Sequence, residues 1–194
     1  KYRIFCDPGP GKYAMNMRNR IQDFQDWVSY DWENIERAAV VRKRSEMSSD
    51  LSQLEVYYPK SKKTELLSQA PSYYNDYDGT RKYNYVYFAH SKELRVWEVR
   101  RFEAALAKGS HFHSELAGGK NVDCAGEIFT LFGKIYEINP QTGHYYKDDP
   151  EFNRCILDVE KHLIEFGYQM SELKEIGWQN EPALLPEQLE KEEL

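Results

Sequence analysis

Alternating side chains in residues 82–102 constrain the fold more than any other feature of the chain. The segment reads KYNYVYFAHSKELRVWEVRRF, and aromatic and apolar side chains take every second position on both sides of AHSK. A period of two residues is typical of β-strands, in which successive side chains point to opposite faces. The segment therefore predicts a hairpin with strands near 83–89 and 94–100.

A second segment of the same kind is EIFTLFGKIYEIN. Its centre, Phe132-Gly133, has the composition of a turn, and Asn139-Pro140 ends it. Two successive hairpins predict an antiparallel sheet in the middle of the chain.

Helical patterns flank this sheet. Residues 16–47 space their apolar side chains for one helix face. SSDLSQLEVYYP predicts a cap and a short turn that stops at Pro59, and SKKTELLSQA predicts another short helix. Residues 149–166 carry the clearest helical stripe. Asp148 or Asp149 can cap this helix, Pro150 suits its first position and Gly167 suits its end.

We therefore predict an α+β fold with N-terminal helices, a central curved antiparallel sheet of hairpins, and a C-terminal helix packed on the sheet. One domain spans 1–172, with a helical part at 16–70, a β-rich part at 80–147 and the helix at 149–166. Residues 173–194 form an acidic extension.

Charge is distributed unevenly along the chain. The net charge is -6, and most of the acidic excess lies in the second half. An acidic half does not suit a broad phosphate-binding surface, so we expect no general nucleic-acid partner. No apolar run approaches the roughly 20 residues of a membrane span, and no signal peptide is visible. The three cysteines form no CxxC pair, and their odd count favours a reducing compartment over a complete disulfide framework.

Candidate chemistry gathers in the glycine-rich stretch from GSHFHSELAGG to TGHYY. Glycine loops permit close backbone approach and can present N–H groups to an anion or a carbonyl. The structural alternative is that a buried histidine donates to a backbone carbonyl and that a serine caps a turn. The polar residues and the glycine concerned are His111, His113, Ser114, Gly119, Glu127, His144 and Tyr145.

Several reactive arrangements of these residues are conceivable. His111 and His113 would share a face of an extended strand, and His144 would complete a metal site, but no spacing is diagnostic and we predict no metal. Ser114, His144 and Glu127 could form a hydrolytic triad, although G-x-S-x-G is missing. Cys124 could act as a nucleophile, but a cysteine is more often a small buried apolar residue.

The segment NIERAAVVRKRSEM offers a different function. As a basic amphipathic helix it could bind an acidic partner such as calmodulin. Its ordinary interpretation is a solvated helix face.

Read in order, FHSELAGGKNVDCAGEI, GKIYEIN and TGHYYKD resemble a shared signature. It is the conserved region of plant IQ-motif calmodulin-binding proteins and of C-terminal domains in bacterial polymorphic toxins and secreted effectors. The resemblance covers roughly residues 83–172. It departs at Glu115, where the signature has a second serine. Ile21-Gln22 is followed by DFQDW, which does not support an IQ motif.

The bacterial resemblance implies a domain that is secreted or injected into another cell and acts there on a cytoplasmic protein target. Some such toxins are ADP-ribosyltransferases, which implies a transferase with NAD as a possible cosubstrate. Glu127, His144 and His113 would then be catalytic. Ser114, His111, Tyr145 and Gly119 would hold the cosubstrate. The alternative is a non-enzymatic module that binds a partner, or a calmodulin-linked regulator.

Overall fold

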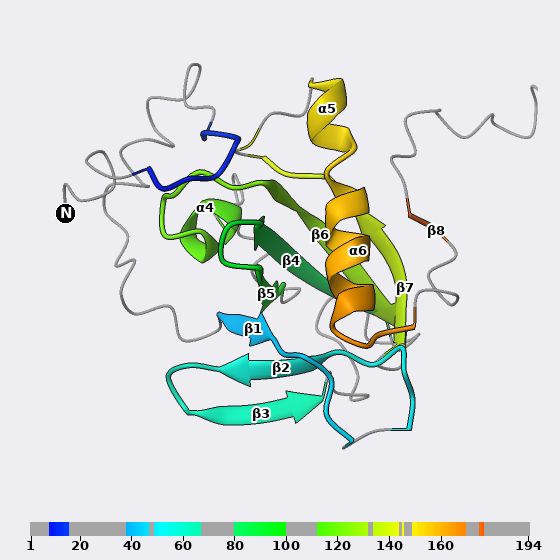
Figure 1. Cartoon of the computed structure of the whole chain (residues 1–194). Helices are drawn as coiled ribbons and strands as arrows, with labels where there is room; N and C mark the ends of the chain where they lie inside the picture. The colour runs from blue at the N-terminus through cyan, green and yellow to red at the C-terminus, as the bar shows by residue number, and fades with distance from the viewer. Residues whose placement is uncertain are drawn as a thin grey trace, which may run out of the picture.

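The protein is mostly β, with seven antiparallel strands in a curled half-barrel sheet (Figure 1). The computed structural model describes residues 8–15, 38–46, 49–66, 80–99, 112–131, 134–143, 145, 149–169 and 175–176. The sheet order is β3-β2-β1-β5-β4-β6-β7-β8, and the short β8 runs parallel to β7. The strands are β1 (Ala39–Val41), β2 (Glu55–Tyr58), β3 (Lys63–Leu66), β4 (Thr80–Phe88), β5 (Glu93–Glu98), β6 (Cys124–Leu131), β7 (Lys134–Asn139) and β8 (Glu175–Ile176).

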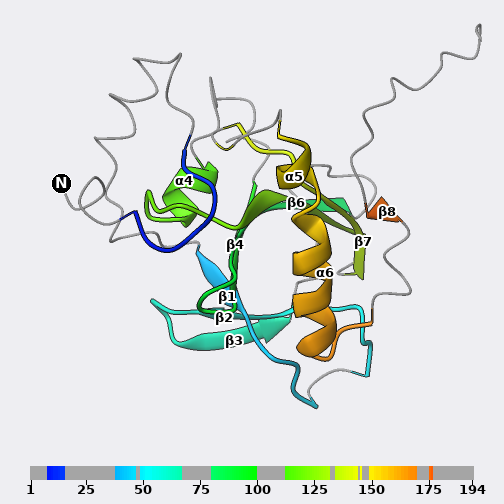
Figure 2. The same cartoon turned by 45° about the horizontal axis from the view of Figure 1, so that its top comes forward.

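Three helices accompany the sheet in the part of the chain that the structure describes. They are α4 (Phe112–Leu116), α5 (Pro150–Asn153) and α6 (Ile156–Glu165). The sheet curls around α6, which lies against its inner face (Figure 2). Cys124 on β6 is bonded to Cys155, and the ring of Tyr87 on β4 packs against His162 on α6. The inner face therefore forms the core between sheet and helix.

The tyrosine alternation of the first predicted hairpin follows from this core. Tyr83, Tyr85 and Tyr87 all point to the inner face and are at most 7% exposed. The hydroxyl of Tyr85 donates to the carbonyl oxygen of Asn139 at 3.0 Å, so the polar end of a fully buried ring is satisfied. Burial raises the pKa of Tyr85, so this hydroxyl stays protonated and can donate.

Both predicted hairpins are confirmed. β4 pairs with β5, and β6 pairs with β7, each in antiparallel register. A register shift between Phe129 and Thr130 marks a bulge in the second hairpin. β4 also pairs with β6 along eight positions, which joins the two hairpins into one sheet.

The helical prediction for 16–70 is wrong wherever the structure describes that region. Residues 39–41, 55–58 and 63–66 are strands. Ala39 and Val41 are buried between two neighbouring strands, where β-branched side chains pack well. Pairing with other strands thus outweighs the helix-like spacing of apolar residues in this segment. The predicted helix residues 16–37 lie outside the described residues.

The basic segment is likewise not an amphipathic helix over its described part. No helix follows β1 over residues 42–46, and the N–H of Arg44 donates to the carbonyl oxygen of Phe166 at 2.8 Å. The hydroxyl of Tyr168 donates to the carbonyl of Arg42 at 2.7 Å and accepts from the N–H of Glu55 at 2.9 Å. These residues fasten the end of α6 to β1 and β2.

The C-terminal helix is confirmed, with a short break between α5 and α6. Asp149 caps α5 by accepting from the N–H of Glu151 at 2.8 Å, and Pro150 takes the first helical position. Gly167 has φ of +91°, as expected of a glycine that ends a helix.

The cysteine expectation needs correction, because Cys124 and Cys155 form a disulfide. Their Cα atoms lie 5.3 Å apart, within the range that a disulfide spans. No spacing in the sequence indicates this pair, because 31 positions separate the two residues and Cys6 makes the number of cysteines odd. None of the helices in the described part of the chain is long and apolar enough to cross a membrane.

Candidate functional site

Residues 112–116 form the helix α4, within the part of the chain, 80–147, that the sequence predicts to be β-rich. The glycine pair ends this helix. Gly118 and Gly119 have φ of +61° and +73°, and the N–H of Gly119 donates to the carbonyl of Ser114 at 2.9 Å. Left-handed backbone favours glycine, so Gly119 has a conformational reason to be where it is.

His113 makes a defined contact with the sheet. Its Nε2 atom lies 2.8 Å from the carbonyl oxygen of Gly126, and the residue is 1% exposed. Gly126 pairs with Tyr85 on β4, so this contact joins α4 to the sheet at the β4–β6 pair. His113 thus donates to a backbone carbonyl, as the structural alternative predicts.

Gly126 itself marks a close approach of two backbones. A Cβ atom at this position would overlap the carbonyl group of Asn139. The glycine of the Ala-Gly-Glu motif is therefore required by strand packing.

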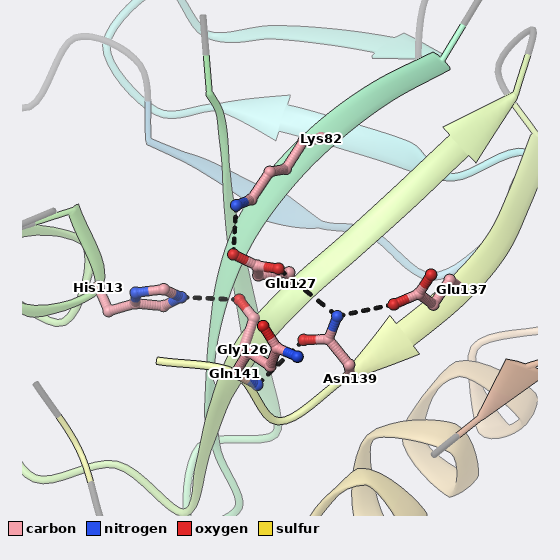
Figure 3. Close-up of polar contacts among 7 residues, drawn as sticks. All are labelled: Lys82, His113, Gly126, Glu127, Glu137, Asn139 and Gln141. Atoms are coloured by element: carbon pink, nitrogen blue, oxygen red, sulfur yellow. Dashed lines mark hydrogen bonds and ion pairs between the residues drawn. The ribbon is translucent and has the colours of Figure 1, made fainter. Parts of the chain in front are cut away.

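Glu127 lies on the outer face of the sheet, the face away from α6, in a chain of polar contacts (Figure 3). Its carboxylate forms an ion pair with Lys82, and the side chains are 14% and 18% exposed. The Nδ2 atom of Asn139 lies 3.5 Å from the other carboxylate oxygen of Glu127 and donates to Glu137 at 2.8 Å. Asn139 Oδ1 accepts from the N–H of Gln141 at 3.0 Å.

Strand register arranges these residues in two neighbouring rows, which we call the outer-face platform. The middle of each row comes from β6, with β4 on one side and β7 on the other. Asn84, Glu127 and Asn139 form one row, and Lys82, Phe129 and Glu137 form the next. Cross-strand partners share a face and lie within contact distance. The ring of Tyr136 lies 6.1 Å from that of Phe129.

The remaining candidates are held inside the fold or lie outside its description. Ser114 is fully buried in α4. Tyr145 is 2% exposed, and its hydroxyl donates to the carbonyl of Lys120 at 2.9 Å. Burial raises the pKa of Tyr145, so it stays protonated. His111 and His144 lie outside the described residues.

Two of the reactive arrangements can be compared with this geometry. The Cys124 nucleophile is wrong, since its sulfur is in a disulfide. His113 lies in a helix, so the extended pairing of His111 with His113 is wrong as well. Within the described ranges, no three potential ligands are grouped to hold a metal ion. The triad stays a prediction because it needs His144.

Sequence reasoning found Glu127 but missed Lys82, Asn84, Glu137 and Asn139. The alternation that predicted the hairpins also places Lys82 and Asn84 on the face opposite the tyrosines. Their meeting with Glu127 depends on the pairing of β4 with β6, and 35 residues of chain lie between these two strands. No motif in the sequence reports that pairing.

Comparison with protein-family models, curated proteins and solved structures finds no match to this chain. The resemblance to toxin and effector domains therefore stays a prediction from motifs.

Proposed function

We propose that the chain is an exported, effector-like domain that acts by binding a protein target through the outer-face platform. The observation that carries the proposal is that two candidate catalytic side chains are already bonded to other groups of the protein. His113 bonds a backbone carbonyl, and Glu127 is paired with Lys82. A general acid or base must be able to reach a substrate proton, and a buried histidine bonded to the backbone is poorly suited to that task.

The disulfide supports the exported part of the proposal. Disulfides persist in oxidising environments and are rare in reducing ones. Cys124 and Cys155 are 0% and 4% exposed, so a structural crosslink is a better interpretation than a redox-active pair.

The platform supports the binding part. Charged groups are costly to remove from water unless they are paired, so half-buried carboxylates in the middle of a sheet invite a functional explanation. Glu127 and Glu137 lie on the face that α6 leaves uncovered. A surface that mixes polar and aromatic side chains in this way suits a protein partner.

Substitution of Glu127 by glutamine tests the proposal. Produced inside a target cell, wild type should slow growth and Glu127→Gln should slow it less, because it removes a charge of the platform; purified wild type should not consume NAD. The matched control is Glu160→Gln on α6, a partly exposed glutamate on the other side of the sheet. No growth effect from wild type contradicts the effector function.

The same experiment tests the alternative that the chain is an ADP-ribosyltransferase. Its supporting observation is that Glu127 keeps a partly exposed carboxylate next to the strand residue that His113 contacts. Consumption of NAD by wild type, abolished in a folded Glu127→Gln variant, would favour the transferase over the binding module. Calmodulin binding has less support, because the described part of the basic segment is not helical.

A further inference from the structure

We infer that protonation of His162 releases the C-terminal end of α6 from the sheet, while the disulfide keeps the start of this helix in place. The inference concerns a change of conformation and does not depend on the proposed binding function. Three observations carry it: a buried imidazole without hydrogen bonds, a covalent crosslink at one end of α6, and hydrogen bonds alone at the other end.

The imidazole of His162 lies between α6 and the sheet. The residue is 2% exposed, and neither ring nitrogen has a hydrogen-bond partner in the described part of the chain. The ring centre lies 5.1 Å from that of Tyr87 on β4 and 4.0 Å from that of Phe166. His113 differs, because its Nε2 atom bonds a backbone carbonyl. Protonation of His162 would bury a cation with two unsatisfied donors, which is costly while the ring stays packed.

Charged and titratable groups approach this ring from α6, from β4 with the turn that follows it, and from the residue before β6. Burial lowers the pKa of His162, Glu165 on α6 raises it, and Lys92 in the β4–β5 turn lowers it. Lys92 and Glu165 pair with each other at 3.1 Å, so the carboxylate is already engaged. Protonation is therefore easier once the ring reaches water. The other such groups are Tyr87, His90, Asp123, Asp158 and Lys161.

The two ends of α6 are held in different ways. Its start is bonded to the sheet, because Cys155 forms a disulfide with Cys124 on β6. Its end is held by hydrogen bonds. The N–H of Arg44 donates to the carbonyl oxygen of Phe166 at 2.8 Å, and the hydroxyl of Tyr168 donates to the carbonyl of the residue after β1 at 2.7 Å. Hydrogen bonds open reversibly without chemistry, so the C-terminal end is the one that can leave the sheet.

Acid should therefore act on one end of the helix. Below a pH of about 6.5, a released imidazole binds a proton that the packed ring does not, so the open form gains population as pH falls. Opening uncovers the ring of Tyr87 on the inner face. Because the disulfide keeps α6 beside the sheet, the helix can return when the pH rises. Histidines that change charge between pH 5 and 7 drive conformational changes of this kind.

Hydrogen exchange of the oxidised full chain, measured by NMR at pH 6.5 and pH 5.5, tests the inference. The rates are corrected for the intrinsic effect of pH on exchange. The N–H groups of Phe166 and Tyr168, which donate to carbonyls of α6, report on its C-terminal end. We expect their protection to fall about threefold to fivefold, because the proton binds mainly to the open form.

Two further N–H groups show whether the opening is local. Cys155 donates to the carbonyl of Phe152 beside the disulfide, and Val99 donates to that of Lys82 at the end of β5. Their protection should change much less than that of Tyr168. An equal fall at all of these positions indicates unfolding of the chain as a whole and overturns the inference. Unchanged protection at Tyr168 overturns it as well.

Two histidine variants distinguish His162 from other titrating groups. His162→Phe keeps an aromatic ring in the same place and should abolish the fall in protection. His90→Gln removes an exposed histidine of the β4–β5 turn and should leave the fall unchanged. A fall that persists in His162→Phe, or that is lost in His90→Gln, contradicts the inference.

The ring signals of His162 in wild type provide a measurement that does not require His162→Phe to fold. Protonation of the ring and loss of protection at Tyr168 should follow the same pH dependence, since one causes the other. A ring that becomes protonated while the protection of Tyr168 stays constant overturns the inference.

Discussion

His113 Nε2 lies 2.8 Å from the carbonyl oxygen of Gly126 on β6. This contact joins α4 to the sheet. We expect His113→Ala to lower the free energy of unfolding by about 1–3 kcal/mol, because it removes a buried hydrogen bond. Urea unfolding measures the change. His113→Gln, which can still donate, should recover part of the loss. A His113→Ala variant as stable as wild type contradicts this role.

The two hairpins were predictable because alternation and turn residues are local signals. The strands β1, β2 and β3 were not, because their stability comes from neighbours distant in the chain. Residues 39–41 pair with both β2 and β5, and nothing in the segment AAVVRK indicates that these strands are its partners. Such short strands depend on packing more than on intrinsic propensity.

The candidate site was predicted in part, for a related reason. Glu127 stood out within a motif, but its ion-pair partner Lys82 lies on a strand that pairs with β6 through long-range contacts. His113 stood out as a possible catalyst, yet in the structure it donates to the backbone carbonyl of Gly126. A motif of His, Ser, Gly and Glu therefore has a structural explanation for three of its members: His113, Gly119 and Gly126.

Two glycines should respond very differently to alanine. A Cβ at Gly126 would overlap the backbone of Asn139, so Gly126→Ala must separate β6 from the end of β7. A Cβ at Gly118 meets nothing within 4 Å, and only its φ of +61° opposes substitution. We expect Gly118→Ala to cost about 1 kcal/mol and Gly126→Ala to cost well above that. Thermal unfolding compares the two, and equal losses contradict the steric explanation.

The disulfide should contribute substantially to stability. It closes a loop of 31 positions between β6 and the start of α6. Closing a loop of this length restricts the unfolded chain, and its removal costs about 3–4 kcal/mol. The double variant Cys124→Ser, Cys155→Ser should unfold at lower urea, and reductant should lower the stability of wild type similarly. Cys6→Ser is the control and should leave the midpoint unchanged. A midpoint insensitive to reductant contradicts the crosslink.

His162 should make the stability depend on pH. Its ring is 2% exposed, packs 4.0 Å from the ring of Phe166 and 5.1 Å from that of Tyr87, and neither nitrogen has a hydrogen-bond partner among the described residues. Burial lowers the pKa of His162 in the folded protein, an effect that nearby Glu165 partly opposes and Lys92 reinforces. The unfolded state therefore binds the proton more readily than the folded state does.

The sign of the pH effect follows from this difference. Stability from the neutral ring is fully present above the unfolded pKa of about 6.5 and is lost as pH falls from there through the lowered folded pKa. We expect the urea midpoint to fall between pH 7 and pH 5.5. His162→Phe keeps an aromatic ring against Phe166 and removes the titrating group, so its midpoint should change less over the same interval. Equal pH dependence in both proteins would show that another group, not His162, causes it.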